Sequence, residues 1–231
     1  MPNTYFQFQQ FRVNQERCAM KVGTDGTLLG AWAQGGQHIL DIGTGTGLIA
    51  LMMAQRYHEA EVTAIDIDPE AVIQARDNVN ASPFAGRIHV LEENIISHQG
   101  IYDSLVCNPP YFEDSLTCPD DRRTLARHTH TLTYKELMAA ACRLLTEEGE
   151  LSLVIPFDCR NHLEQEAALN GLFKIRECGV KTTPAKPPRR FLLAFGKHPK
   201  LMEQTTEVLE DKPGHRSDWY EELTHEFYLR K

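Results

Sequence analysis

The sequence predicts an α/β fold built on a mostly parallel β-sheet with helices on both faces. Three observations carry this prediction. Short apolar runs alternate with segments of helical periodicity, no internal repeat or low-complexity tract interrupts them, and 231 residues suffice for one large domain. With 42% apolar and 24% charged residues the composition is ordinary for a globular protein, which excludes disorder and a fibrous structure.

Seven apolar runs have the length and composition of buried strands. They cover residues 38–42, 61–67, 87–91, 104–107, 150–155, 172–180 and 191–195. The last two runs are joined by a Pro-rich basic loop at 181–190, which is the best hairpin connection in the chain. The sequence therefore predicts a seven-stranded sheet that ends in a hairpin.

Helices are predicted between these strands, where start signals precede apolar residues at helical spacing. Asp68, followed by a proline, provides the N-cap of one helix, and Thr133 with Glu136 forms a capping box for another. Residues 48–54 are apolar on every side, so this helix should be buried against the sheet. A last helix is predicted over 217–229.

The segment before the first predicted strand contains a turn cluster at 21–26 and an apolar helix at 27–33. We expect 1–37 to be an N-terminal flank or lid of a single domain that spans 1–231. No apolar stretch approaches the about 20 residues of a membrane span, and the N-terminus has no apolar core behind a basic start. We therefore expect a cytoplasmic protein.

The six cysteines are widely spaced and include no C-x-x-C pair, which supports neither a disulfide framework nor a structural metal site. His128 and His130 flank one residue, but a lone pair of this kind in a polar segment is more typical of a solvated loop. We expect no metal.

Charge is distributed unevenly along the chain. The excess of 32 acidic over 24 basic residues gives a net charge of −8, which argues against indiscriminate binding of polyanions. However, eight Lys and Arg residues between 174 and 200 are accompanied only by Glu177, and Arg122, Arg123 and Arg127 form a second basic run. Confined basic segments favour a localised site for a polyanion, with two solvated loops as the alternative.

A glycine-rich turn follows the first predicted strand. Gly43, Gly45 and Gly47 stand between that strand and a helix, a context in which backbone N–H groups can bind a cofactor. The G-x-G-x-G spacing differs from the G-x-G-x-x-G of dinucleotide-binding proteins, which disfavours NAD. Asp41, at the apolar strand end, is costly to bury unpaired and is expected to organise the glycine turn or a ligand cation.

Asp66 lies at the end of the second predicted strand, about 20 residues beyond the glycine turn. An acidic residue at this place can accept hydrogen bonds from both hydroxyls of a ribose. The alternative is a helix N-terminal acid, a role that Asp68 already fills.

The most specific pattern is Asn108-Pro109-Pro110-Tyr111, which follows the fourth predicted strand. The two prolines remove N–H donors and stiffen the turn, so its carbonyl groups are left free to accept hydrogen bonds. An exocyclic amine could donate to the Asn108 side chain and the Pro109 carbonyl while its ring stacks on Tyr111. These bonds would aim the nitrogen lone pair at an electrophile without a strong general base.

The glycine turn, Asp66 and the Asn-Pro-Pro-Tyr motif, in this order, resemble the class I, Rossmann-like S-adenosyl-L-methionine-dependent methyltransferases of the N6-adenine type. More narrowly, residues 11–33, 189–195 and 226–229 are similar to the bacterial tRNA1(Val) (adenine-37-N6)-methyltransferase family. The resemblance implies a seven-stranded sheet with an antiparallel last strand and S-adenosyl-L-methionine as the cofactor. It also implies methyl transfer to the N6 of the adenine just 3′ of a tRNA anticodon.

The same resemblance implies the cofactor site by position. Its residues would be Lys21, Thr24, Asp25, Asp41, Gly43, Gly45, Gly47, Asp66 and Asn94. Asp41 and the glycines would line the methionine moiety, Asp66 would hold the ribose, and the first three residues would close the pocket. Asn94 stands where the family usually has an Asp for the cofactor's adenine amine, and Glu93 is the alternative.

The basic segments are expected to contact the tRNA. In a sheet of this type the 181–190 hairpin and the segment after Tyr111 both emerge at the carboxyl edge, beside the pocket. Six residues are therefore expected to touch phosphates: Arg122, Arg123, Arg127, Lys186, Arg189 and Arg190.

Other acceptors and other classes of protein stay open. Asn-Pro-Pro-Tyr also occurs in enzymes that methylate release-factor glutamines, DNA adenines or rRNA guanines, because the motif indicates an amine and not a macromolecule. A DNA enzyme commonly has a separate recognition domain, for which the chain has little room, and a protein acceptor would not require the basic segment. An NAD-dependent oxidoreductase would leave 108–111 without a role, and a non-catalytic RNA-binding protein would leave the cofactor site unexplained. We expect tRNA as the partner, with no DNA, membrane or protein partner.

Overall fold

The computed structural model describes residues 4–18, 20–109 and 132–229. At its centre is an eight-stranded mixed sheet with the strand order β10-β8-β9-β7-β6-β3-β4-β5. The strands of this sheet are β3 (His38–Ile42), β4 (Glu61–Asp66), β5 (Ile88–Glu92), β6 (Tyr102–Cys107), β7 (Leu145–Pro156), β8 (Phe173–Lys181), β9 (Arg190–Gly196) and β10 (Glu203–Val208). All seven predicted strands are confirmed; β7 begins five residues before the predicted start, and every other end differs by at most two residues.

The pairing of the strands places their carboxyl ends at a common edge. β3 pairs in parallel with β4 and β6, which in turn pair in parallel with β5 and β7. β9 lies between β7 and β8 and is antiparallel to both, which confirms the predicted hairpin and the antiparallel strand that the resemblance implied. β10 adds an eighth strand, parallel to β8 at the edge of the sheet.

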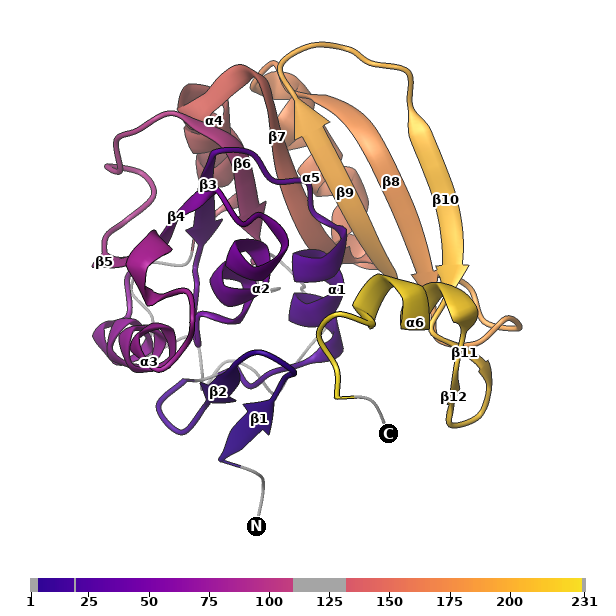
Figure 1. Ribbon diagram of the computed structural model, residues 1–231. Coiled ribbons are helices and arrows are strands. Elements are labelled where there is room, and N and C mark those ends of the chain that lie inside the picture. The colour runs from indigo at the N-terminus through magenta and orange to yellow at the C-terminus, as the bar shows by residue number, and fades with distance from the viewer. Residues whose placement is uncertain (1–3, 19, 110–131, 230–231) are drawn as a thin grey trace, which may run out of the picture.

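Two hydrophobic cores cover the two faces of the sheet (Figure 1). One core contains residues of α1 (Thr24–Trp32), α2 (Leu48–Arg56), α3 (Pro69–Asn80) and α6 (Asp218–Thr224). The other contains residues of α4 (Tyr134–Leu144) and α5 (Arg160–Leu169). Because side chains alternate along a strand, Asp41 of β3 points toward the same face as Ile39, the face that α1 and α2 cover.

The predicted helix starts agree with the structure. α2 is buried from Leu48 to Gln55, as its continuous apolar sequence predicted. Asp68 caps α3 by accepting a hydrogen bond from the Glu70 N–H, and Thr133 forms the predicted capping box at the start of α4. α1 begins at Thr24, three residues before the predicted start.

The prediction of a helix over 217–229 is wrong in its second half, because α6 ends at Thr224. The carbonyl group of Phe227 accepts a hydrogen bond of 2.8 Å from the Gln9 N–H, and Tyr228 forms an isolated bridge with Phe8. The N-terminal segment thus pairs with residues 227 and 228 where the helix was predicted to continue. Residues 8–9 and 227–228 therefore lie next to each other.

Two short hairpins complete the described structure. β1 (Tyr5–Gln7) pairs with β2 (Arg12–Asn14) near the N-terminus, and β11 (Glu210–Lys212) pairs with β12 (His215–Arg216) before α6. In these described parts of the chain, no helix has both the length and the apolar character that crossing a membrane requires.

Candidate active site

A cavity of about 260 Å³ lies where the glycine turn, the segment before α1 and the start of β9 meet. The predicted site residues that line it are Lys21, Thr24, Asp25, Gly43, Gly45, Asn108 and Arg190. The fold therefore brings three separate sequence patterns to one place at the carboxyl edge of the sheet.

The backbone of the glycine turn is shaped for a close approach by a ligand. Gly43, Gly45 and Gly47 have φ angles of 68°, 55° and 80°, a left-handed region that other residues rarely adopt. A Cβ atom on Gly43 would meet nothing within 4 Å, whereas one on Gly47 would lie 3.4 Å from the Cβ of Ala75 in α3. Open space thus lies beside the first part of the turn, whereas its end lies within van der Waals distance of α3.

Asp41 supports the turn from below and does not line the cavity. Its side chain is completely buried, and its Oδ2 accepts hydrogen bonds from the Thr44 hydroxyl at 2.6 Å and the Ala50 N–H at 3.1 Å. Its Oδ1 is buried with no hydrogen-bond partner among the described residues. Burial raises the pKa of Asp41 to about 7, against the lowering effect of the Thr44 and Ala50 hydrogen bonds. Of its two predicted roles, this geometry supports organisation of the turn.

Asp66 is joined to the glycine turn by its own carboxylate. Its Oδ2 accepts a hydrogen bond of 2.9 Å from the Gly45 N–H, and its Oδ1 accepts one of 3.0 Å from the Asp68 N–H. The N-terminal segment passes nearby at Cys18, where burial, with the charges of Asp66 and Asp68 adding to it, raises the pKa of the thiol to about 11. Asp66 therefore lies between the turn and the N-terminal segment.

Glu93 and Asn94 follow β5 directly beside Asp66, because the Glu93 N–H donates a hydrogen bond of 3.0 Å to the Asp66 carbonyl. The Glu93 carboxylate is bound to Nδ1 of the buried His98 at 2.5 Å, and Nε2 of His98 lies 2.8 Å from the Tyr102 hydroxyl. Asn94 is half-buried, and its Oδ1 accepts a hydrogen bond of 2.9 Å from the Ile96 N–H. Asp66 and Asn94 thus lie along one edge, outside the lining of the cavity.

Asn108 and Pro109 follow the buried end of β6, where Asn108 is half-buried and Pro109 is buried. Asn108 lines the cavity together with Gly43 and Gly45. The other predicted residues of this region lie outside the described residues: Pro110, Tyr111, Arg122, Arg123, Arg127, His128 and His130.

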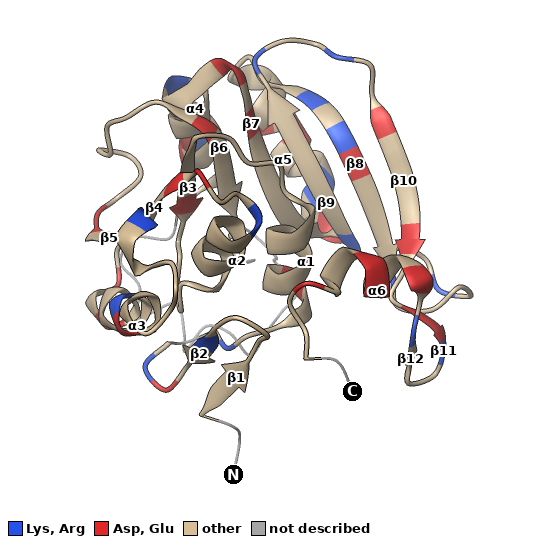
Figure 2. Ribbon diagram, viewed as in Figure 1, with Lys and Arg blue, Asp and Glu red and all other residues tan. Residues whose placement is uncertain are grey.

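Most of the basic segment at 174–200 is neutralised within the fold. Five of its eight basic residues form ion pairs, namely Lys174 with Glu164 and Glu177, Arg176 with Glu150, Arg190 with Asp25, Lys197 with Glu147 and Lys200 with Glu148. Figure 2 shows basic and acidic positions side by side along β8. Within the described chain no such ion pair involves Lys181, Lys186 or Arg189, so the remaining positive charge gathers at the β8–β9 hairpin.

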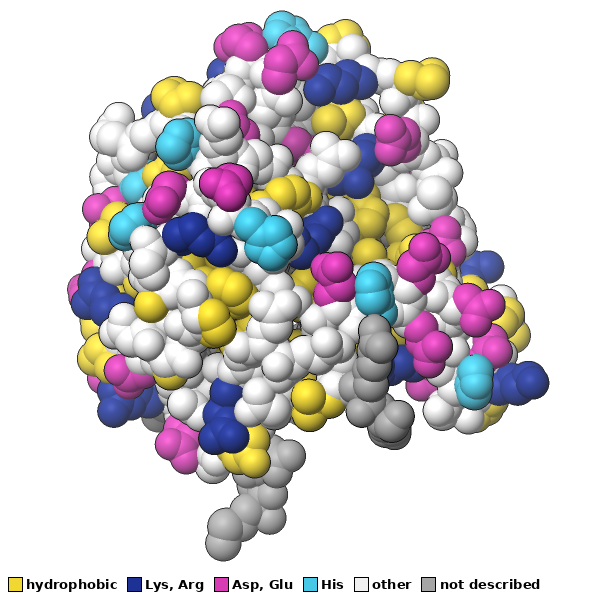
Figure 3. Space-filling model, viewed as in Figure 1, with side chains coloured by type: hydrophobic (Ala, Val, Ile, Leu, Met, Phe, Trp, Pro, Cys, Tyr) yellow, Lys and Arg dark blue, Asp and Glu magenta, His cyan; other side chains and the backbone are white. Residues whose placement is uncertain are grey.

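The face toward the viewer in Figure 3 has basic, acidic and histidine side chains interspersed over it, without a single broad basic area. The hairpin is therefore the better candidate for a phosphate contact than this face. Lys186 and Arg189 are both exposed there. Arg189 is followed directly by Arg190, which lines the cavity.

Two amide side chains of α3, which were not among the predicted residues, bind the N-terminal segment. Asn78 donates hydrogen bonds of 2.8 Å to the carbonyl groups of Thr46 and Asn14, and Gln74 accepts one of 3.3 Å from the Arg17 N–H. Both side chains are buried. Two amides four residues apart, next to an apolar helical stripe, are the pattern that could have indicated this contact.

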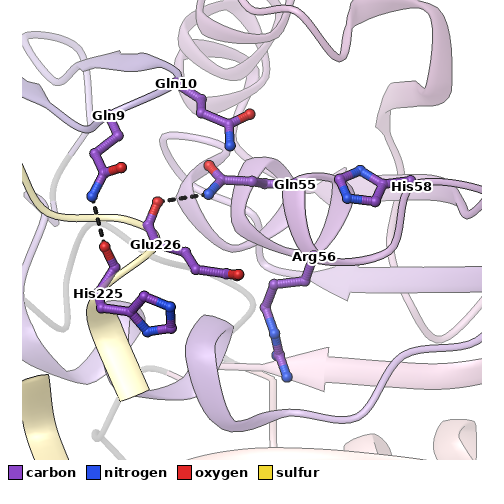
Figure 4. Close-up of a pocket in the computed structure, with 7 residues that line it drawn as sticks. All are labelled: Gln9, Gln10, Gln55, Arg56, His58, His225 and Glu226. Atoms are coloured by element: carbon purple, nitrogen blue, oxygen red, sulfur yellow. Dashed lines mark hydrogen bonds between the residues drawn. The ribbon is translucent and has the colours of Figure 1, made fainter. Parts of the chain in front are cut away.

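A second cavity of about 310 Å³ lies at the far end of α2 (Figure 4). Gln55 and Arg56 line it, whereas Leu48 and Ile49 line the first cavity, so the two are separated by about 9 Å of helix. Two amide side chains in its lining bind the segment after α6. Gln9 donates a hydrogen bond to the carbonyl group of His225, and Gln55 donates one to the carbonyl group of Glu226. The second cavity is therefore remote from the glycine turn and is no candidate for the cofactor.

The fold and the site define a methyltransferase. Residues 25–183 match the family described as the Methyltransferase small domain. A predicted O-methyltransferase from Agrobacterium tumefaciens has a TM-score of 0.68 at 19% identity, covering 88% of this chain and 96% of its own. A methyltransferase from Pyrococcus furiosus has a TM-score of 0.54 at 22% identity, covering 74% and 80%. These likenesses confirm the predicted class I fold.

Curated relatives identify a narrower family within the methyltransferases. tRNA1(Val) (adenine(37)-N6)-methyltransferases from Bacteroides thetaiotaomicron and Parabacteroides distasonis are 45% and 46% identical, over 99% and 100% of both chains. One from Histophilus somni is 42% identical over 97% of both. The chain belongs to the tRNA1(Val) (adenine(37)-N6)-methyltransferase family. This membership confirms the predicted family, the enzyme class and S-adenosyl-L-methionine as the cofactor.

Proposed function

We propose that the protein transfers the methyl group of S-adenosyl-L-methionine to the exocyclic N6 of adenine 37 in a tRNA. The observation that carries this proposal is one cavity lined both by the glycine turn and by Asn108. A methyl donor held at the turn and an amine held at Asn108 would be neighbours there. The names of the full-length relatives supply the adenine and its position.

The residues around the cavity fit the cofactor. Gly43 has open space where a side chain would stand, and the backbone N–H groups at the start of α2 favour an anionic group such as a carboxylate. In this proposal Lys21, Thr24 and Asp25 close the methionine end, and the edge at Asp66 and Asn94 holds the adenosine. We assign Asn94 to the adenine amine by its position in the family pattern and keep Glu93 as the alternative, since each side chain already accepts one hydrogen bond, Asn94 from the Ile96 N–H and Glu93 from His98.

The bound cofactor supplies an electrophilic methyl group. Asn108 and Pro109 would each offer a carbonyl oxygen to one N–H of the adenine amine. Pro109 has no backbone N–H, so its backbone can only accept a hydrogen bond. These two bonds turn the nitrogen lone pair out of conjugation with the ring and toward the methyl group. The proton released from the methylated nitrogen passes to water, so no strong base is required. Pro110 and Tyr111 complete the motif in sequence, with Tyr111 as the stacking platform.

The tRNA would lie across the β8–β9 hairpin. Lys186 and Arg189 are exposed in the loop that leads to Arg190 of the cavity, and they are proposed to contact phosphates. Arg122, Arg123 and Arg127 join this proposal from the sequence alone. An unstacked loop base costs the least to capture, which suits an anticodon loop. We further propose that the whole chain acts as one unit, with 1–37 as a flank over the cofactor, in the cytoplasm where tRNA is found.

The test is methyl transfer from labelled S-adenosyl-L-methionine to separate acceptors, which are unmodified total tRNA, ribosomal RNA, genomic DNA and a release factor. We expect N6-methyladenosine from tRNA alone. The matched control is a transcript in which guanine replaces adenine 37, and it should accept no label. Label in glutamine or in DNA, with tRNA silent, would overturn the proposal.

A further inference from the structure

One ion pair lies in the lining of the cavity. Asp25 lies in the first turn of α1, and Arg190 is the first residue of β9. The Arg190 Nε and the Asp25 Oδ1 form the ion pair, and both residues line the cavity together with the glycine turn. The side chains are 40% and 18% exposed, so a ligand in the cavity can reach both charges.

The amino-acid end of S-adenosyl-L-methionine carries the same two charges as this pair. Its α-ammonium group is complementary to the Asp25 carboxylate, and its α-carboxylate is complementary to the Arg190 guanidinium, which binds carboxylates through two parallel hydrogen bonds. The start of α2 lines the same cavity and also favours an anion.

We propose that the cofactor's amino-acid end replaces the ion pair, so that Asp25 binds its ammonium group and Arg190 binds its carboxylate. This inference rests on the proposed function, because it requires the methyltransferase cofactor. One intramolecular pair is exchanged for two intermolecular pairs, so neither protein charge is left unpaired in either state. Arg190 is thereby assigned to the cofactor and separated from Lys186 and Arg189, which are left to the tRNA.

The proposed exchange makes different predictions from two alternative roles of Arg190, which are a purely structural ion pair and a contact with tRNA. A purely structural ion pair would depend only on the presence of opposite charges, whichever residue carries each. A tRNA contact would leave cofactor binding unchanged when the charge is removed. Recognition of a zwitterion instead requires the negative charge at position 25 and the positive charge at position 190. It affects the binding only of ligands that carry the amino-acid end.

The experiment measures binding to the full chain by calorimetry, with S-adenosylhomocysteine and 5′-methylthioadenosine as the probes. The second probe keeps the adenosine and lacks the amino-acid end. We expect Arg190→Gln and Asp25→Asn each to weaken S-adenosylhomocysteine binding by about tenfold or more, the usual effect of losing a hydrogen-bonded charge. Binding of 5′-methylthioadenosine should change less than about twofold. Lys181→Gln, at the other strand of the same hairpin, is the matched control and should change neither.

The charge-swapped double variant, Asp25→Arg with Arg190→Asp, completes the test. A structural ion pair would recover S-adenosylhomocysteine affinity in this variant, whereas the proposal predicts no recovery. Recovery, an equal loss for both probes, or parental affinity in Arg190→Gln would each overturn the proposal. If Arg190→Gln loses its thermal unfolding transition, Arg190→Lys repeats the comparison with the positive charge retained. A parent chain that binds neither probe would instead refute the proposed function.

Discussion

The pH dependence of folding stability should report the buried carboxyl group of Asp41. Burial raises its pKa from 3.8 to about 7, and its Oδ1 has no hydrogen-bond partner among the described residues. Between about pH 4 and 7 the folded chain therefore holds a proton that the unfolded chain releases. The contribution of this group to stability is greatest at low pH and is lost as the pH rises through 7.

The size of the effect follows from the two pKa values. A difference of one bound proton changes the free energy of unfolding by about 1.4 kcal/mol per pH unit. Applied to both pKa values, this relation gives a decrease of about 2 kcal/mol in the free energy of unfolding between pH 5 and pH 7. Asp41→Asn has no titrating group and keeps an oxygen for Thr44 and Ala50. Its stability relative to the parent should therefore rise by about 2 kcal/mol over this interval.

Urea unfolding of both chains at pH 5, 6, 7 and 8, without cofactor, measures this difference. Asp77→Asn is the matched control, because Asp77 is exposed on α3, and this variant should follow the parent at every pH. A difference between Asp41→Asn and the parent that is the same at every pH would refute the reasoning.

Three further predictions concern binding and catalysis. Asp66→Ala should weaken cofactor binding by about 1.5–3 kcal/mol in calorimetry, since a charged hydrogen-bond acceptor is lost, and parental affinity would contradict the ribose role. Asn108→Ala should keep cofactor affinity and lose methyl transfer in single-turnover assays, because the missing acceptor acts when the amine is aligned; an unchanged rate would remove the mechanism. Joint replacement of Lys186 and Arg189 by Gln should reduce the slope of log affinity for tRNA against log salt concentration by about 0.7 per lost phosphate contact. An unchanged slope would show that neither residue contacts a phosphate.

The buried strands and capped helices could be predicted because their signals are local. Strands such as β9 contain a continuous apolar run, and α3 and α4 begin at side chains that cap them. β10 could not be predicted in this way, because an exposed edge strand with the sequence EQTTEV has no apolar alternation. α5 buries only Leu163 and Ala167 and has no side-chain cap, so its periodicity is weak.

The candidate site was predictable where its residues are neighbours in sequence. The glycine turn and Asn108 were found from short motifs, and the fold brings them to one cavity. The basic segment was overestimated, because its partners come from other elements, such as Glu150 of β7 for Arg176. Ion pairs of this kind depend on which strands become neighbours, and composition along the chain does not contain that information.

Contacts with three other parts of the chain, namely α3, β9 and the segment after α6, hold the N-terminal segment in place. Asn78 of α3 binds both Asn14 and the glycine turn, and the carbonyl groups of 225–228 bind Gln9. Arg190 of β9 binds Asp25 across the cavity itself. The first two contacts use neutral amide and backbone groups, whereas the third joins two charged side chains that line the cavity. Under the exchange proposed above, the neutral contacts would hold the N-terminal segment in place while the cofactor's amino-acid end replaces the ion pair.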